Sequence, residues 1–215
     1  MTASGSNMMW VAKIDDESML NLGFLASRNG SAMRAIISAI ESGDLQARPL
    51  IAVSNNRKAA ALEFAAAHGV ATAVIPTQAD PVAADEMLAQ ALENAGVELV
   101  VLSGYLRRLG PRTLARYQNR ILNIHPGLLP EFGGEGMYGR KVHEAVIGAG
   151  AGASGATIHL VDEIYDHGPI VDRRTVPVHA GDTPESLEAR VTAMEPGFFI
   201  DTLRRIAAGD LELPS

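Results

Sequence analysis

Two polar side chains stand two residues apart in the segment Asn123-Ile124-His125-Pro126, at the end of an otherwise apolar run. Residues two apart in a strand point to the same side, so the Asn123 amide and the His125 imidazole would face one space. Pro126 favours extended backbone at His125 and ends the strand. An amide donor beside a titratable ring can stabilise a developing oxyanion and move a proton. A polar pair that only completes backbone hydrogen bonds is the competing interpretation.

A second polar segment, DEIYDHGP at 162–169, is rich in carboxylates, and its Gly-Pro pair would fix its shape. A carboxylate close to His125 would orient the ring and favour its charged form. Taken alone, the stretch is better explained as a solvated acidic turn. The weaker histidine candidates lie at a helix end, inside a strand and before the last helix: His68, His159 and His179.

A third segment, SRNGSAMR at 27–34, joins a strand to a helix and contains a glycine. The first N–H groups of a helix lack partners inside it and carry partial positive charge, so they can bind an anion, with Ser31 adding a hydroxyl. An ordinary helix cap explains the same residues equally well. The segment contains neither the G-x-x-x-x-G-K of a P-loop nor the G-x-G-x-x-G of dinucleotide-binding proteins.

The elements that must position these segments follow from the periodicity of apolar residues. From Leu20 to Pro126, apolar runs of strand length alternate with stretches whose apolar residues recur at helical spacing. This alternation predicts an α/β fold, a parallel sheet with helices on both faces, whose strand carboxyl ends share one ligand-binding edge. The expected strands are 20–27, 48–56, 70–76, 97–105 and 121–126, and the expected helices are 27–45, 57–69, 81–96 and 110–120.

The pattern changes after Pro130. The expected elements are a glycine-rich loop at 131–140, a helix at 141–150, strands at 155–163 and 168–178, and a closing helix at 183–209. The two strands alternate in polarity and are close enough in sequence to pair as an antiparallel unit. Thr183 could cap the closing helix, with Pro184 at its first position. Pro196 should kink or split that helix.

Composition narrows the class of protein. The 215 residues suit one domain at 20–215, with halves 20–126 and 127–215, after an N-terminal extension at 1–19. The net charge of −7 does not suit a nucleic-acid-binding protein. The absence of cysteine excludes disulfides and thiolate chemistry, no histidine spacing fits zinc, and no G-x-S-x-G motif indicates a serine hydrolase. No apolar run approaches ~18 residues and no signal-peptide pattern is visible, so we expect a cytoplasmic protein.

Taken together, the segments 24–36, 100–134 and 152–196 resemble the folate-dependent formyltransferases. The most specific part is N-x-H-P-x-L-L-P followed by D-x-G-P, and the SRNGS loop is similar to the branch that acts on glycinamide ribonucleotide. The resemblance implies a Rossmann-like N-terminal half with antiparallel strands in the C-terminal part. It implies that 10-formyltetrahydrofolate donates its formyl group to the amine of glycinamide ribonucleotide in purine synthesis, without a metal.

The resemblance also implies roles for individual residues. The catalytic residues would be Asn123, His125 and Asp166. The nucleotide would contact Asn29, Gly30, Ser31, Ala32 and Glu195. The folate would contact Arg107, Arg108, Leu109, Leu122, Asn123, Val161, Asp162 and Asp166. Asn123 would donate to the oxyanion formed when the amine attacks, for roughly 3–4 kcal/mol. Protonated His125 would supply charge, and Asp166 would keep it charged and help to move a proton.

Three departures from the family pattern accompany the resemblance. Ala32 stands where relatives often have Asn, which leaves more of the phosphate contacts to backbone N–H groups. His167 stands where glycine is common, and the segment 133–146, GGEGMYGRKVHEAV, is longer than in many members.

Several alternative functions remain open at this point. They are formylation of an amino-sugar nucleotide, hydrolysis of formyltetrahydrofolate, and non-catalytic binding of a folate or nucleotide. A deformylase of this type would carry a further N-terminal domain, and a transfer-RNA formyltransferase a further C-terminal one. We expect small-molecule substrates, a monomer or homodimer, and neither nucleic acid nor membrane as a partner.

Overall fold

The computed structural model describes residues 19–215, so the extension expected at 1–19 lies almost wholly outside the described residues. The strands are β1 (Leu20–Leu25), β2 (Ala47–Ser54), β3 (Ala71–Val74), β4 (Leu99–Leu102), β5 (Ile121–His125), β6 (Ala153–Leu160) and β7 (Ile170–Pro177). The helices are α1 (Ser31–Glu41), α2 (Ala60–Ala67), α3 (Pro81–Asn94), α4 (Pro111–Arg116), α5 (Arg140–Gly148) and α6 (Pro184–Ala207). Every strand and helix expected from the sequence is present, with boundaries shifted by a few residues.

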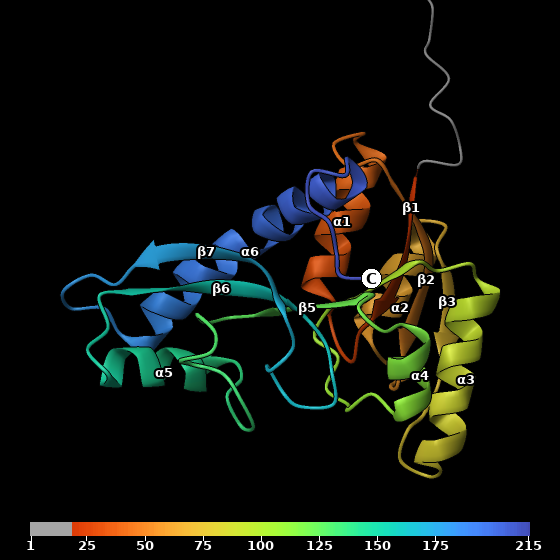
Figure 1. Cartoon of the computed structure of the whole chain (residues 1–215), viewed down its shortest axis with the longest axis horizontal. Helices are drawn as coiled ribbons and strands as arrows, with labels where there is room; N and C mark the ends of the chain where they lie inside the picture. Colours follow the sequence, from red (N-terminus) through yellow and green to blue (C-terminus); the bar gives the residue numbers. More distant parts are fainter. Residues whose placement is uncertain (1–18) are drawn as a thin grey trace, which may run out of the picture.

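One seven-stranded sheet has the order β3-β2-β1-β4-β5-β6-β7. The first five strands pair in parallel, whereas β6 pairs antiparallel with both β5 and β7. Figure 1 shows the resulting shape, in which β6 and β7 extend the sheet away from the parallel half. The fold class predicted from the sequence, a mostly parallel sheet with antiparallel strands in the C-terminal part, is confirmed.

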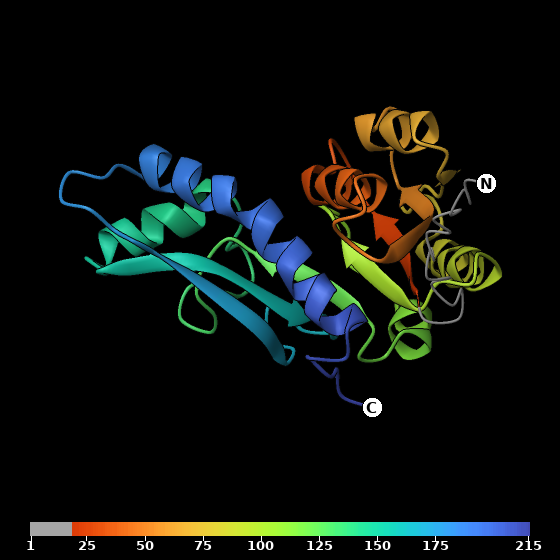
Figure 2. The same ribbon diagram turned by 90° about the horizontal axis from the view of Figure 1, so that it is seen from above.

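Helices cover both faces of the sheet because the central strands are apolar on both sides. Residues of α1, α2, α5 and α6 pack into one buried cluster with Phe24 and Leu122. Residues of α3 and α4 pack into a second cluster on the opposite face with Leu25 and Ile121. Figure 2 shows the two layers of helices with the sheet between them.

The chain reverses direction across the sheet between β1 and β4. After β1 it winds outward to β2 and β3, and it then returns to place β4 on the other side of β1. Loops at the carboxyl ends of β1 and β4 therefore diverge and leave a crevice, which is where open α/β sheets bind ligands. The Met33 N–H donates to Ser103 Oγ at 2.9 Å, and the Ser27 N–H donates to the Gly104 carbonyl at 3.1 Å, so the two loops have a fixed spacing.

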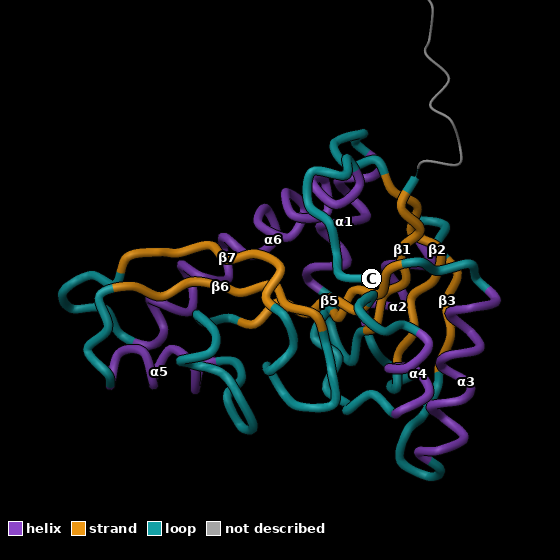
Figure 3. Tube along the Cα trace, viewed as in Figure 1, coloured by secondary structure: helices purple, strands orange, loops and turns teal. Residues whose placement is uncertain are grey.

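Helix α6 crosses the back of the sheet as one continuous helix of 24 residues. Thr183 caps it and Pro184 occupies its first turn, as predicted. Pro196 lies inside the helix without splitting it (Figure 3), so the helix does not divide there, whereas the kink stays a prediction. Proline removes one helical hydrogen bond, but the buried side chains of Val191 and Phe198 hold the helix on the core on either side of it. Among the described residues, no helix is long and apolar enough to cross a membrane.

Candidate active site

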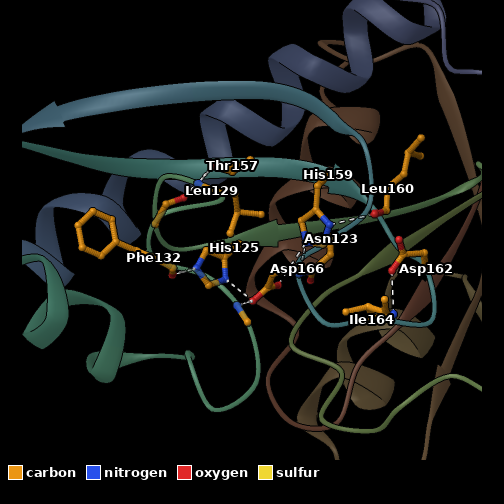
Figure 4. A network of polar contacts seen from close by, with 12 residues as sticks. Asn123, His125, Leu129, Phe132, Thr157, His159, Leu160, Asp162, Ile164 and Asp166 are labelled. Atoms are coloured by element: carbon orange, nitrogen blue, oxygen red, sulfur yellow. Dashed lines mark hydrogen bonds and ion pairs between the residues drawn. The ribbon is translucent and has the colours of Figure 1, made fainter.

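Neighbouring strands β5 and β6 bring four polar side chains together at one place on the sheet. In the antiparallel register, Asn123 lies opposite His159, and His125 lies opposite Thr157. Directly opposed residues on adjacent strands project from the same face, so their side chains contact one another. Figure 4 shows Asn123 and His125 on one side of β5, as their spacing predicts, with His159 beside them.

Asn123 is oriented by His159. The His159 Nδ1 lies 2.9 Å from the carbonyl oxygen of Leu160, which can only accept, so Nδ1 carries the hydrogen. With the hydrogen on Nδ1, Nε2 can accept a hydrogen bond from the Asn123 amide at 3.1 Å. This contact fixes which end of the amide is the donor. It leaves the second amide hydrogen of Asn123 without a partner among residues 19–215, and available to a ligand.

His125 is held between the Phe132 carbonyl and the Asp166 carboxylate (Figure 4). Its Nε2 donates to the Phe132 carbonyl at 2.7 Å, which leaves Nδ1 as the titrating nitrogen. Nδ1 lies 3.3 Å from Asp166 Oδ2. A proton on Nδ1 would therefore be shared with a carboxylate, in a ring that is only 3% exposed.

Asp166 lies between two histidines because its loop folds back over the strands. Its Oδ2 accepts the Gly134 N–H at 3.0 Å, and its Oδ1 lies 3.5 Å from His159 Nε2. The Asp166 backbone has φ 56°, a left-handed conformation that few residues other than glycine adopt. Side chains in strained backbone often belong to functional sites. A side chain at position 133 would overlap Leu129, so glycine there lets the loop 131–140 approach Asp166.

Burial and neighbouring polar groups shift the pKa values of His125 and Asp166 in opposite directions. Burial lowers the pKa of His125 below its ordinary value of 6.5, although Asp166 and the Phe132 carbonyl raise it. Burial raises the pKa of Asp166, but His159, His125 and the Gly134 N–H together lower it overall. Asp166 favours the charged form of His125, in the expected direction, but desolvation of the ring is the larger effect on the His125 pKa. At neutral pH, His125 is a neutral base facing a carboxylate.

Two further anchors hold the loops around the site. Thr157 is fully buried, donates to the Gly127 carbonyl at 2.8 Å and accepts the Leu129 N–H at 3.1 Å, so it fixes the turn after β5. Asp162 accepts the Ile164 N–H at 2.8 Å and contacts His167 Nδ1 at 2.9 Å. His167, which departs from the family pattern, thus closes the loop that carries Asp166.

A cavity of about 700 Å³ beside this loop is lined by three of the eight residues expected to contact a folate, whereas Leu122, Asn123, Val161, Asp162 and Asp166 do not line it. Arg107, Arg108 and Leu109 lie in its wall, together with Glu163, whose carbonyl accepts a hydrogen bond from Arg108. Its volume falls in the range of small-molecule sites. Val161 packs against the buried cluster that contains Leu88 and Leu109, two residues of the cavity wall. Leu122 does not take part, because alternate residues of β5 face opposite sides and its side chain is buried against Phe24 and α6.

The residues expected to contact a nucleotide divide into two groups. Asn29, Gly30, Ser31 and Ala32 lie together at the start of α1, next to the loop that follows β4. Gly30 has φ 67°, and a side chain there would crowd Ala61, so this turn requires glycine. The N–H groups of Ser31 and Ala32 have no acceptor among residues 19–215.

Glu195 lies on α6 and makes no hydrogen bond or ion pair within the described residues. It follows the buried Val191 by one helical turn and therefore points inward. Burial raises its pKa to about 7. A half-buried carboxyl without a partner is costly unless a ligand supplies one.

His159 is the site residue that sequence reasoning placed among the weaker candidates. It lies inside β6, and nothing in its local sequence reveals that β5 pairs with β6 in the register that sets it opposite Asn123. The T-x-H alternation in β6, matched to N-x-H in β5, was the available signal. Among residues 19–215, no group of three or more potential metal ligands is close enough to hold a metal ion.

Comparison with known proteins gives concordant results. A family model described as formyl transferase matches residues 20–203. The sheet, the Asn-His pair and the aspartate loop thus lie in a chain that belongs to the formyl transferase family. The names of the individual proteins that this chain resembles are more specific than the family description. The phosphoribosylglycinamide formyltransferase of Arabidopsis thaliana is 36% identical over 212 residues, which are 95% of this chain and 72% of that protein.

Two further comparisons cover most of both chains. The phosphoribosylglycinamide formyltransferase of Haemophilus influenzae is 32% identical over 197 residues, 91% of each protein. The crystal structure of glycinamide ribonucleotide transformylase 1 from Symbiobacterium toebii superimposes with a TM-score of 0.82 at 32% identity, covering 99% of this chain and 97% of that one. Similarity of this extent in sequence and structure supports a shared reaction as well as a shared fold.

Proposed function

We propose that this protein transfers the formyl group of 10-formyltetrahydrofolate to the amine of glycinamide ribonucleotide, a step of purine synthesis. The observation that carries the proposal is the arrangement of Asn123, His125 and Asp166 in a chain of the formyl transferase family. The relatives bear the name of this activity. The three side chains meet near the carboxyl ends of the parallel strands. The loop before α1, where the nucleotide would bind, and the cavity of about 700 Å³ open on the same side of the sheet.

Asn123 would bind the oxygen of the formyl group. That oxygen gains negative charge when the amine attacks the formyl carbon, and a fixed amide donor stabilises it. His159 already accepts one hydrogen of the Asn123 amide at 3.1 Å, so the second is held in one direction. A donor that needs no reorientation at the moment of reaction contributes most, roughly 3–4 kcal/mol for one group.

His125 and Asp166 would manage the proton that the attacking amine must lose. The neutral ring of His125 offers Nδ1 as the acceptor, because Nε2 is committed to the Phe132 carbonyl. Once Nδ1 is protonated, Asp166 at 3.3 Å stabilises the charged ring and holds the proton for return to the leaving nitrogen. Neither step requires a covalent bond between the enzyme and the formyl group.

The cavity of about 700 Å³ that is lined by Arg107, Arg108 and Leu109 fits the ring system of a folate. Its walls include the apolar side chains of Leu88, Leu109 and Leu114, and it reaches Glu163 in the loop that carries Asp166. Flat heterocycles bind in such apolar clefts with a few polar groups fixing their orientation. The phosphate of the ribonucleotide would bind the free N–H groups of Ser31 and Ala32, and Glu195 would contact the sugar hydroxyls.

Formyl transfer with purified protein tests the proposal and its rivals together. We expect tetrahydrofolate to appear from 10-formyltetrahydrofolate only when glycinamide ribonucleotide is supplied. Release without an acceptor would identify a deformylase, and release with an amino-sugar nucleotide alone would identify that branch. Binding of both ligands without any product would favour a non-catalytic binder. The cytoplasmic location, the single domain and the monomeric or dimeric state remain predictions.

A further inference from the structure

Arg34, in the first turn of α1, holds the loop that precedes its own helix. Its Nε donates to the Asn29 carbonyl at 2.8 Å, and its Nη2 donates to the Ala60 carbonyl at 3.0 Å. A guanidinium group is a planar fork of donors, so one side chain can bind two carbonyls in a fixed arrangement. The Arg34 side chain therefore links the loop after β1 to the start of α2.

An aromatic ring supports the same guanidinium group. Arg34 Cζ lies 4.5 Å from the centre of the Phe64 ring, which is a cation–π contact. His68 stacks on Phe64 with ring centres 4.1 Å apart, and its Nδ1 lies 2.8 Å from Glu41 Oε1. Since Arg34 and Glu41 both belong to α1, this row of side chains joins α1 to α2 along its length. The position of the Arg34 fork is thus set by two hydrogen bonds and a ring contact.

The loop that Arg34 holds is also packed closely against α2. The Ala61 N–H donates to the Arg28 carbonyl at 3.0 Å. Gly30 has φ 67°, and a Cβ atom there would lie 2.9 Å from the Cβ of Ala61. The loop therefore has little room to move towards α2, and Arg34 opposes movement away from it by binding the carbonyl that precedes Gly30.

Two of the first four N–H groups of α1 are left for a ligand. Those of Met33 and Arg34 donate to acceptors within the protein. Those of Ser31 and Ala32 have no acceptor in the part of the chain that the structure describes. The turn at Gly30 sets the direction of both free N–H groups, because the helix begins there. A side chain that fixes this turn therefore fixes the pair of donors.

We propose that Arg34 is a positioning residue that holds the Ser31 and Ala32 N–H groups in the arrangement that binds the phosphate of the acceptor substrate. The inference rests on the proposed function, which puts that phosphate at these two groups. Because Ala32 has no polar side chain, the backbone donors carry the contact. Donors that are fixed before the ligand arrives avoid the cost of ordering the loop on binding. The Arg34 fork donates to backbone carbonyls, so it acts through the loop.

Steady-state kinetics of Arg34→Met and Arg34→Lys test this role. Arg34→Met removes the fork, whereas Arg34→Lys keeps the positive charge without the planar pair of donors. The KM for glycinamide ribonucleotide should rise about tenfold in both, because the hydrogen bonds of a charged group that order the loop are lost. The kcat and the KM for 10-formyltetrahydrofolate should not move. The matched control is Arg204→Met, whose Nε binds the Asp44 carbonyl at 3.1 Å beyond the other end of α1, and it should retain the wild-type KM.

An acceptor without a phosphate separates this role from a general loss of structure. The kcat/KM for glycinamide riboside should be the same in the wild type and in Arg34→Met, both shown to be folded by circular dichroism. An unchanged KM for the ribonucleotide in Arg34→Met, or an equal fall in kcat/KM for both acceptors, would overturn the inference. A wild-type KM in Arg34→Lys would also overturn it, since charge alone would then suffice. Failure of the proposed function differs from all of these, because the wild-type protein would then formylate neither acceptor.

Discussion

In this largely buried site, His125 and Asp166 each shift the pKa of the other. Burial lowers the pKa of His125, and Asp166 raises it without cancelling that effect. The ring is therefore neutral at pH 7 and can accept a proton, and the ion pair with Asp166 forms during the reaction rather than before it. His159 contributes indirectly by orienting the Asn123 amide.

The rate should consequently fall on the acid side as His125 becomes protonated. Since its pKa is lowered from 6.5, we expect the acid limb of kcat/KM to have its midpoint below pH 6.5. Asp166→Asn removes the carboxylate that raises this pKa, so the remaining activity should have its limb at still lower pH. Stopped-time assays from pH 4.5 to 8 measure both profiles. A midpoint above 6.5, or a shift to higher pH in the variant, would contradict the account.

Glu195 should make the stability of the unliganded protein depend on pH. Its pKa is about 7 in the folded protein and ordinarily 4.5. The folded state therefore holds this proton more tightly, and its stabilising effect is complete below 4.5 and lost as pH rises through 7. Glu195→Gln should remove roughly 1–3 kcal/mol of that pH dependence. Urea unfolding at pH 5 and pH 8 measures it, and parallel losses in wild type and variant would contradict the prediction.

At the scale of elements, α4 depends on a carboxylate from another helix. Asp85 of α3 accepts the N–H groups of Arg112 and Thr113 at 2.8 and 3.0 Å and the Thr113 hydroxyl at 2.6 Å. Gly110 precedes α4 without a side-chain cap, and a side chain there would overlap Asp85. The wall of the larger cavity is thus built by contact between two helices.

Asp85→Ala should therefore destabilise the fold and weaken folate binding together. It leaves the buried N–H group of Thr113 unpaired, which costs about 2–3 kcal/mol. The control is Glu86→Ala, whose exposed ion pair with Arg112 at 3.0 Å should contribute less than about 1 kcal/mol. Denaturant unfolding gives both values. Equal losses in the two variants would show that Asp85 does not serve as the cap of α4.

Gly168 limits how the loop that carries Asp166 can close. A side chain there would overlap the carbonyl oxygen of Leu160, so Gly168→Ala should displace the loop and reduce kcat at least tenfold. Gly152→Ala is the control, because a side chain at 152 meets nothing within 4 Å. Crystal structures of the variant and control locate Asp166. Full activity in Gly168→Ala would show that the position of this loop does not limit turnover.

Most helices and strands could be predicted from the sequence, because their buried apolar residues recur with the period of a helix or a strand. The run at β4 and the helical spacing in α1 predict their elements directly, and the Asn-Gly turn before α1 marks its start. The effect of Pro196 could not be predicted, because it depends on whether flanking side chains are buried by the rest of the fold. Tertiary packing outweighs the lost hydrogen bond there.

The candidate site was less visible, because it depends on strand register. Asn123 and His125 could be paired from their spacing alone. Asp166 was inferred from a family resemblance, and its contact with His125 depends on a loop conformation with positive φ. His159 comes from a separate strand, and only the folded sheet brings it next to Asn123.

For the whole molecule, the division of the sheet into parallel and antiparallel parts explains why two substrates can meet. The loop proposed to bind the nucleotide follows β1, the larger cavity lies between the loop after β4 and helices α3 and α4, and Asn123 lies in the middle of β5. The antiparallel strands β6 and β7 then return the chain so that their connecting loop brings Asp166 to the site (Figure 4). Holding both reactants in one crevice is itself a large part of the rate enhancement.

The most direct test of this account is product analysis of one reaction in wild type and His125→Asn. With 10-formyltetrahydrofolate and glycinamide ribonucleotide, mass spectrometry should detect the formylated ribonucleotide and tetrahydrofolate in equal amounts from the wild-type protein. His125→Asn, shown to be folded by circular dichroism, should form them at least about 100-fold more slowly. Formylated ribonucleotide at the wild-type rate from the folded variant, or none from the wild type, would contradict the central claim.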